Sequence, residues 1–103
     1  MKKNKYTSIE KIIQLTKKGK MFILVDDEKR ENEGDLVIST SYSNPKNINF
    51  MAKNGRGLIC MALDTAQAKK LNLTLMSSVN ISRNPKTAFT VSIEARKGVT
   101  TGI

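Results

Sequence analysis

Residues 21–35 have the sequence Met21-Phe22-Ile23-Leu24-Val25-Asp26-Asp27-Glu28-Lys29-Arg30-Glu31-Asn32-Glu33-Gly34-Asp35, in which an apolar run is followed directly by a charged one. The apolar run predicts a buried strand, because it is short and uninterrupted. Six of the last ten residues are acidic, although the whole chain carries a formal net charge of +9. Clustered carboxylates repel one another unless a cation offsets them. The stretch therefore predicts a metal or acid–base site, and the alternative is a solvated charged turn.

Helices and strands are expected on both sides of this stretch. Thr7 is the expected N-cap of a first helix, with Glu10 as its capping-box partner, and Gly19 is the expected residue just past its end. Pro45 is expected to open a short helix that closes near residues 54–55, and Asp64 or Thr65 to cap another that runs to about Leu71. The expected strands are Met21–Asp26, Asp35–Thr40, Gly57–Leu63 and Ala88–Glu94.

This alternation of helices and strands predicts an α/β or α+β fold with a mixed sheet. The length of 103 residues suits one small domain. Cys60 is the single cysteine, which excludes an internal disulfide and fits a reducing compartment. The absence of histidine excludes the usual zinc sites and any Ser-His-Asp triad in this chain.

The basic N-terminus lacks the apolar run expected of a signal peptide, and no apolar run approaches the length that spans a membrane. These features predict a cytoplasmic protein without a membrane partner. The basic excess raises the alternative of nucleic-acid binding. However, the lysines and arginines are scattered, with no interleaved aromatic residues to stack on bases. We therefore expect no nucleic-acid partner, and a positive field would also attract a small anionic substrate.

Three blocks of sequence together resemble one enzyme family. The acidic stretch Asp26-Asp27-Glu28-x-Arg30-Glu31-Asn32-Glu33-Gly34-Asp35-Leu36 resembles the signature loop of the 3,4-dihydroxy-2-butanone 4-phosphate synthases. Gly55-Arg56-Gly57-Leu58-Ile59-Cys60 resembles the second block of that family, and residues 87–95 with 98–102 resemble the third. The resemblance implies a three-layer α/β/α fold around a mixed sheet, normally a homodimer. It also implies that residues 1–103 are the N-terminal portion of a single domain, incomplete at its C-terminal end.

The resemblance also implies a reaction. The family acts on ribulose 5-phosphate in riboflavin biosynthesis, removes a proton beside a carbonyl and releases formate. By resemblance Glu31 is a ligand of Mg²⁺ (or Mn²⁺), Arg30 contacts the sugar phosphate and Asp35 contacts a substrate hydroxyl. Asp26 and Glu33 would shape the site and relay protons. The family also places a cysteine near its site, which makes Cys60 a candidate, and the alternative is a cysteine of the core. Thr100 and Thr101 lie between two glycines, where they are expected to offer hydroxyl and amide groups to a substrate, and the alternative is a flexible end.

The chain departs from the family pattern in one respect. The second metal ligand of the family is a histidine in the C-terminal half of its domain, where another catalytic glutamate also lies, and this chain has no histidine. One carboxylate cannot replace a glutamate and a histidine as metal ligands. The resemblance therefore implies that this chain alone is inactive. The alternative is a catalytically dead remnant or binding module that keeps the fold.

Overall fold

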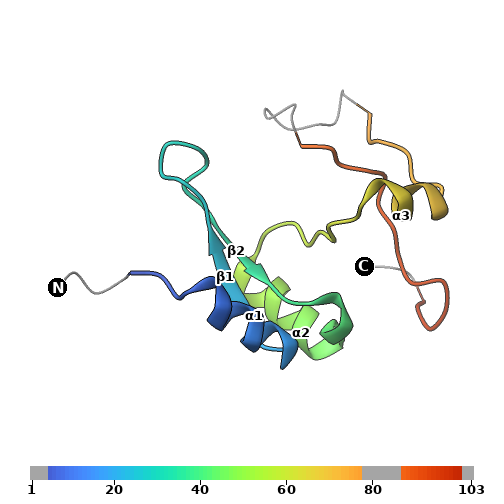
Figure 1. Ribbon diagram of the computed structural model, residues 1–103. Coiled ribbons are helices and arrows are strands. Elements are labelled where there is room, and N and C mark those ends of the chain that lie inside the picture. The colour runs from blue at the N-terminus through green and yellow to red at the C-terminus, as the bar shows by residue number, and fades with distance from the viewer. Residues whose placement is uncertain (1–4, 78–86, 101–103) are drawn as a thin grey trace. The chain divides into compact units, whose positions relative to one another are not determined.

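The computed structural model describes residues 5–77 and 87–100 of the chain. Contacts divide the chain into two units, Met1–Met61 and Ala62–Ile103. In chain order the helices and strands are α1 (Ile9–Lys17), β1 (Phe22–Val25), β2 (Gly34–Val37), η1 (Thr40–Tyr42), α2 (Pro45–Phe50), η2 (Met51–Gly55) and α3 (Thr65–Lys70) (Figure 1). A small antiparallel sheet with helices confirms the α+β class.

Helix α1 begins one residue later than predicted. Ser8, and not Thr7, is the N-cap, because its extended backbone lets its side chain accept a hydrogen bond from the Lys11 amide at 3.3 Å. Glu10 consequently lies in the first turn of α1, where the helix dipole stabilises a carboxylate. It does not complete a capping box. The predicted C-terminal end of α1 is confirmed. Gly19 just past it has φ +77°, and its amide donates a hydrogen bond to the Thr16 carbonyl at 3.0 Å.

Strands β1 and β2 form an antiparallel hairpin whose tip is the acidic loop, residues 26–33. Phe22 pairs with Val37 at the open end, and Val25 pairs with Gly34 at the tip. Both strands are shorter than predicted, and the expectation that the first is buried is wrong. Ile23 is 65% exposed and Leu24 is 57% exposed. Among the described residues none is fully buried, so the hairpin has only a partial apolar cover.

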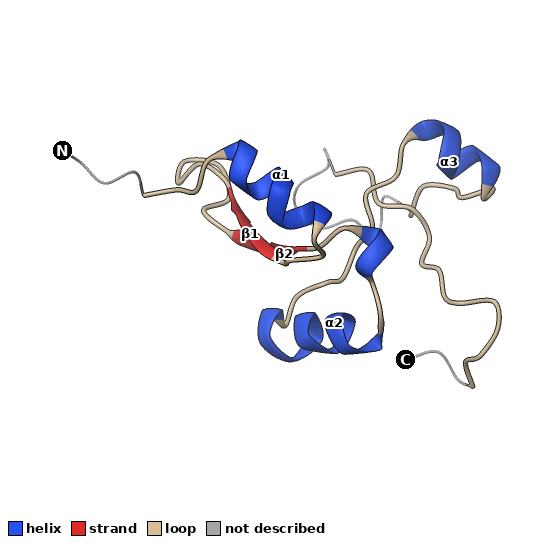
Figure 2. Cartoon of the chain, turned by 60° about the horizontal axis from the view of Figure 1, so that its bottom comes forward, coloured by secondary structure: helices blue, strands red, loops and turns tan. Residues whose placement is uncertain are grey.

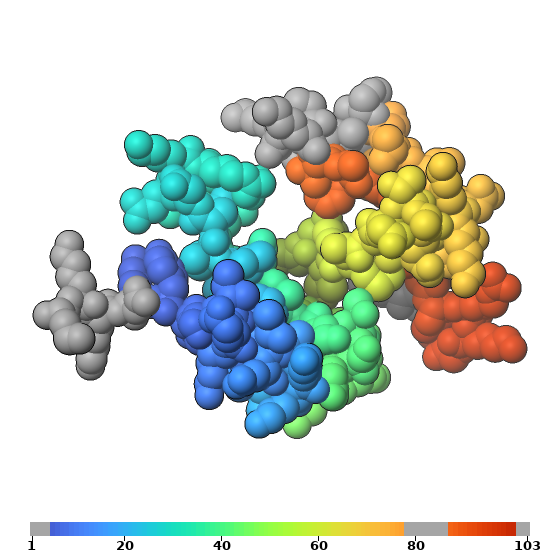
Figure 3. All heavy atoms as spheres, in the orientation of Figure 1, coloured from blue at the N-terminus to red at the C-terminus, as the bar shows by residue number. Residues whose placement is uncertain are grey.

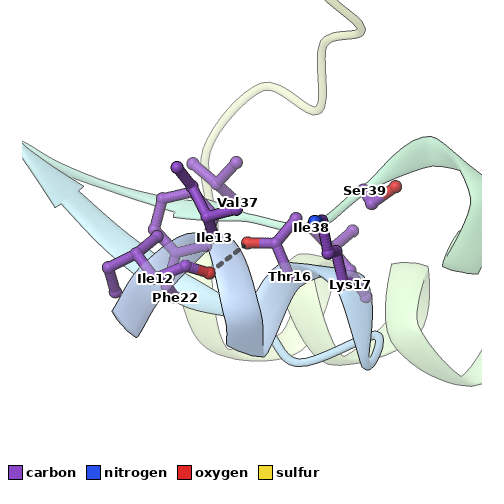
Figure 4. Close-up of a pocket in the computed structure, with 8 residues that line it drawn as sticks. All are labelled: Ile12, Ile13, Thr16, Lys17, Phe22, Val37, Ile38 and Ser39. Carbon is purple, nitrogen blue, oxygen red and sulfur yellow. Dashed lines mark hydrogen bonds between the residues drawn. The ribbon is translucent and has the colours of Figure 1, made fainter. Parts of the chain in front are cut away.

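That partial cover comes from helices on both faces of the hairpin. Residues paired across antiparallel strands point to the same face, and Phe22 and Val37 face α1. They line an apolar hollow of about 340 Å³ between helix and sheet (Figure 4) with Ile12, Ile13, Thr16, Lys17, Ile38 and Ser39. On the opposite face, Leu36 lies beside η2. A Cβ atom at Gly55 would be 3.3 Å from Cδ1 of Leu36. Figure 2 shows α1 and α2 with the hairpin.

Tyr42 ties the chain after β2 back to the end of α1. Its hydroxyl donates a hydrogen bond to the Lys17 carbonyl at 2.9 Å. Its ring lies against Gly19, so closely that a Cβ there would be 2.8 Å from Cγ of Tyr42. This contact and the positive φ both require glycine at position 19.

We therefore expect Gly19→Ala to destabilise the first unit. The left-handed backbone alone should cost about 1–2 kcal/mol, and the overlap with the Tyr42 ring adds to it. Gly57→Ala is the matched control, because a Cβ at Gly57 meets nothing within 4 Å. The free energy of unfolding, measured by urea denaturation, should fall for Gly19→Ala and stay nearly unchanged for Gly57→Ala. Equal stabilities of the two variants would contradict the Tyr42 contact.

The short helix predicted from Pro45 is confirmed. Asn44 caps α2 by accepting a hydrogen bond from the Asn47 amide at 2.9 Å, and Pro45 occupies the first turn. The helix continues as the π-helical turn η2, which ends at Gly55 and is followed by Arg56 with φ +58°. Asp64, one of the two predicted caps, is the N-cap of α3. Its side chain accepts a hydrogen bond from the Gln67 amide at 2.7 Å.

Two predicted strands are corrected. Residues 57–63 form neither helix nor strand, and Leu58 there is 78% exposed. The predicted strand Ala88–Glu94 is reduced to one bridge, between Thr90 and Leu75. The flanking hydrogen bonds run from the Met76 amide to the Phe89 carbonyl at 2.8 Å and from the Val91 amide to the Thr74 carbonyl at 2.9 Å. Apolar composition predicted strands, but a strand also needs a neighbour to satisfy its backbone.

Helices in the described part of the chain are all too short or too polar to cross a bilayer.

Candidate functional site

The acidic loop has an ordered backbone built around Asp27. The Asp27 side chain accepts a hydrogen bond from the Lys29 amide at 2.7 Å, and the Asp27 carbonyl accepts from the Arg30 amide at 2.9 Å. Asn32 then adopts a left-handed conformation with φ +52°, which asparagine tolerates better than most residues. The chain thereby turns back, and the Asp26 amide donates to the Glu33 carbonyl at 3.3 Å. The loop is therefore a defined turn, and Figure 3 shows it (cyan) standing out from the first unit.

Asp26 accepts three hydrogen bonds through both oxygens of its carboxylate. Oδ1 accepts from the Glu33 amide at 2.9 Å. Oδ2 accepts from the Glu31 amide at 2.9 Å and from Nη1 of Arg30 at 2.9 Å. The Glu33 amide contributes most to lowering the pKa of Asp26; partial burial opposes the shift, and the Glu31 amide and Arg30 add to it. Asp26 is therefore held as a carboxylate at the base of the loop.

Arg30 lies between two carboxylates. Its Nη1 contacts Asp26 at 2.9 Å, and its Nη2 is 3.5 Å from Oε1 of Glu31. The Arg30 side chain is 64% exposed, whereas that of Asp26 is 19% exposed. A guanidinium has five N–H donors, so these two contacts leave donors of Arg30 toward solvent. This arrangement offsets the charges of Asp26 and Glu31, and it presents a cation and a carboxylate side by side.

The lowered pKa of Asp26 predicts how the loop responds to acid. A carboxyl whose pKa is lower in the folded state contributes stability above its unfolded value, and that contribution is lost as the pH falls through the folded value. The order of the loop should therefore persist at the ordinary aspartate pKa of 3.8 and disappear only at lower pH. Following the ¹³C shift of the Asp26 carboxyl by NMR titration tests this. A midpoint at or above 3.8 would contradict the three hydrogen bonds.

The structure brings together four of the predicted site residues in this loop: Asp26, Arg30, Glu31 and Glu33. Asp35 follows on β2, exposed and opposite Leu24. Cys60 is an exposed free thiol in the irregular segment after η2. Thr100 is exposed in the second unit, and Thr101 lies outside the described residues. Asp27 and Asn32 shape the loop, although the sequence analysis gave them no role. The turn preference of Asp and Asn was the available signal.

Carboxylate oxygens are the donors that Mg²⁺ and Mn²⁺ prefer. The type of donor at Glu31 therefore fits such an ion. Within residues 5–77 and 87–100 no group of three or more histidine, cysteine, aspartate or glutamate side chains is arranged to hold a metal. The described residues therefore contain no complete set of metal ligands of these types.

The hairpin and its loop define a class of protein: an α+β protein that presents carboxylates and an arginine at the tip of a hairpin. The chain belongs to the 3,4-dihydroxy-2-butanone 4-phosphate synthase family, whose sequence profile matches residues 10–103. This confirms the family resemblance that the three sequence blocks indicated.

Individual relatives agree with the profile. The chain is 46% identical over 99 residues to a 3,4-dihydroxy-2-butanone 4-phosphate synthase of Campylobacter jejuni, a match that covers 96% of this chain and 29% of that protein. It is 50% identical over 97 residues to the synthase of Photobacterium phosphoreum, covering 94% of this chain and 26% of that protein. The chain thus spans little more than a quarter of the length of these relatives.

A solved structure shows the same fold. The crystal structure of RibBX, a two-domain 3,4-dihydroxy-2-butanone 4-phosphate synthase from A. baumannii, matches with a TM-score of 0.78 and 47% sequence identity. The match covers 94% of this chain and 28% of that one. At this identity the likeness extends beyond fold to the family itself.

Proposed function

We propose that this chain supplies part of the active site of a 3,4-dihydroxy-2-butanone 4-phosphate synthase, a lyase of riboflavin biosynthesis. The reaction converts D-ribulose 5-phosphate to L-3,4-dihydroxy-2-butanone 4-phosphate and formate. The observation that carries the proposal is the acidic loop, in which a carboxylate and a guanidinium lie side by side in a chain of this family. The chain alone is inactive, because it lacks the histidine that the family resemblance requires as a metal ligand.

Residues 1–103 form the N-terminal portion of a single domain with a three-layer α/β/α fold around a mixed sheet. Two contacts support the layering, since α1 packs on the Phe22 and Val37 face of the hairpin and η2 lies beside Leu36 on the other face. The exposed apolar side chains of the hairpin support the need for further cover. The complete enzyme is a cytoplasmic homodimer, as the family resemblance implies.

Three residues of the hairpin take the principal roles. Glu31 is the metal ligand, through a carboxylate held at the loop tip. Arg30 binds the phosphate of the substrate, through the guanidinium donors that Asp26 and Glu31 leave to solvent. Asp35 accepts a hydrogen bond from a substrate hydroxyl, from its exposed place on β2. A bound Mg²⁺ or Mn²⁺ supplies a hard cation that stabilises negative charge on substrate oxygens.

The remaining site residues have supporting roles. Glu33 takes or returns a proton of the substrate, and its amide hydrogen bond to Asp26 fixes its backbone. Asp26 shapes the site. Cys60 belongs to the catalytic group, and its exposure as a free thiol leaves it accessible to substrate. Thr100 and Thr101 offer hydroxyl and amide groups to the substrate.

A chimera tests the proposal directly. In it, this chain replaces the matching segment of the Campylobacter jejuni relative, which is 46% identical to it. We expect the purified chimera to release formate from ribulose 5-phosphate in the presence of Mg²⁺. The unaltered Campylobacter jejuni protein is the control for the assay. A chimera that is folded, by circular dichroism, and yet releases no formate would overturn the proposed function.

The basic excess of the chain does not serve nucleic acid. Nonspecific binding of a basic protein to duplex DNA is electrostatic and weakens steeply with salt. We expect any binding of this chain to DNA to be weak and to disappear between about 50 and 200 mM salt. Fluorescence anisotropy with a labelled duplex measures it. Sequence-specific binding that survives the higher salt would favour a nucleic-acid-binding protein over the enzyme.

A further inference from the structure

We propose that Asp26 is a positioning residue, whose single carboxylate fixes both the backbone of Glu31 and the guanidinium of Arg30 in the geometry that metal and phosphate require. This inference rests on the proposed function for the roles of Glu31 and Arg30. Its structural part, that Asp26 holds the loop together, stands independently of them.

The hydrogen bonds of Asp26 reach across the loop. One oxygen, Oδ2, joins the Glu31 amide and Nη1 of Arg30, each at 2.9 Å, and so couples the backbone of one site residue to the side chain of its neighbour. The other oxygen, Oδ1, holds the Glu33 amide at 2.9 Å, seven residues away in sequence. Asp26 itself follows β1 directly, so these bonds fasten the loop tip to the hairpin.

The pairing with Asp26 also orients Arg30. A guanidinium is planar and rigid, so fixing Nη1 on Asp26 and placing Nη2 3.5 Å from Glu31 sets the direction of the whole group. Its remaining donors can then meet a phosphate without the cost of ordering a long, exposed side chain. Such preorganisation of Arg30 acts mainly on substrate affinity. The hydrogen bond from the Glu31 amide to Asp26 acts on metal affinity, because it fixes the backbone of the proposed ligand.

These three bonds favour a positioning role over proton relay. A carboxylate has about four lone-pair positions, and three of those of Asp26 already accept hydrogen bonds from the loop, so most of its acceptor capacity holds the loop. Glu28 provides the matched control. It carries the same charge in the same loop, and the described part of the chain shows no hydrogen bond or ion pair for it.

The test compares three variants of the chimera: Asp26→Ala, Asp26→Asn and Glu28→Ala. Millisecond hydrogen–deuterium exchange, read by mass spectrometry, reports the protection of the amides of Glu31 and Glu33. We expect Asp26→Ala to speed exchange of both amides, and Asp26→Asn to speed at least one, since an amide side chain has only one acceptor oxygen. Glu28→Ala should leave both unchanged. Exchange in Asp26→Ala equal to that of the parent chimera would overturn the inference.

Kinetics provide a second readout. Loss of an outer partner typically costs 10- to 100-fold in metal affinity or activity, so Asp26→Ala should raise the KM for ribulose 5-phosphate and the Mg²⁺ concentration for half-activity by about 10-fold or more. Unchanged KM and Mg²⁺ dependence with a lowered kcat would contradict positioning and favour proton relay. If the parent chimera releases no formate, the proposed function fails, but the exchange measurement still decides whether Asp26 holds the loop. If Asp26→Ala does not fold, Asp26→Asn decides by the same criteria.

Discussion

Glu31→Gln in the chimera should abolish formate release. Glutamine keeps the size of the side chain and removes the charge that a hard cation requires. Because loss of an outer partner alone costs 10- to 100-fold, loss of a direct ligand should lower turnover by more than about 100-fold. Binding of Mg²⁺, measured by calorimetry, should weaken in parallel. The fold should remain, since the hydrogen bond to Asp26 comes from the Glu31 backbone and not from its side chain.

Glu28→Gln is the control for that experiment, because it removes the same charge from the same loop. We expect its turnover and Mg²⁺ affinity to stay close to those of the parent chimera. Near-normal turnover of Glu31→Gln would reject the metal-ligand assignment. Equal losses in both variants would show that the overall charge of the loop matters and not the position of one carboxylate.

The second large effect concerns the isolated chain, which should bind a hydrophobic dye strongly and self-associate. Large apolar side chains are exposed in both units, among them Ile23 at 65%, Leu58 at 78% and Leu75 at 67%. Soluble monomers rarely leave such surface uncovered, and the hairpin of β1 and β2 presents unpaired strand edges that recruit other chains. Dye fluorescence and light scattering of the purified chain measure the two effects.

The remaining part of the Campylobacter jejuni relative, supplied in trans, is the matched partner for this test. Dye binding and scattering should both fall when it is added, because it should cover the same apolar residues. An unrelated soluble protein at the same concentration should change neither. A chain that is monomeric on its own and does not bind the dye would contradict the view that it is part of a larger domain.

Local sequence signals suffice to place most of the helix boundaries of this chain. Capping and turn residues were informative, since Pro45, Asp64 and Gly19 each mark a helix boundary through contacts within a few residues. The N-cap of α1 was missed by one residue because Thr7 and Ser8 are both good caps. The apolar segments 57–63 and 88–94 misled the prediction. Their composition suits strands, but pairing depends on neighbours that composition does not reveal.

The candidate site was predictable in its residues and not in its geometry. The acidic stretch after β1 identified Asp26, Arg30, Glu31 and Glu33 together. The sequence did not reveal that the Asp26 carboxylate accepts hydrogen bonds from the amides of Glu31 and Glu33. That arrangement depends on the left-handed turn at Asn32, which bends the loop back on itself. The role of the Asp26 carboxylate in holding the loop therefore appears only in three dimensions.

The most direct measurement is the release of formate from ribulose 5-phosphate with Mg²⁺ by this chain, alone and with the remaining part of the Campylobacter jejuni relative. We predict no release by either part alone and clear release by the two together. Glu31→Gln in this chain should then remove the restored activity. Turnover by the chain alone would show that its own 103 residues complete the site. No turnover by a mixture that forms a stable complex would show that the chain has lost the activity of its family.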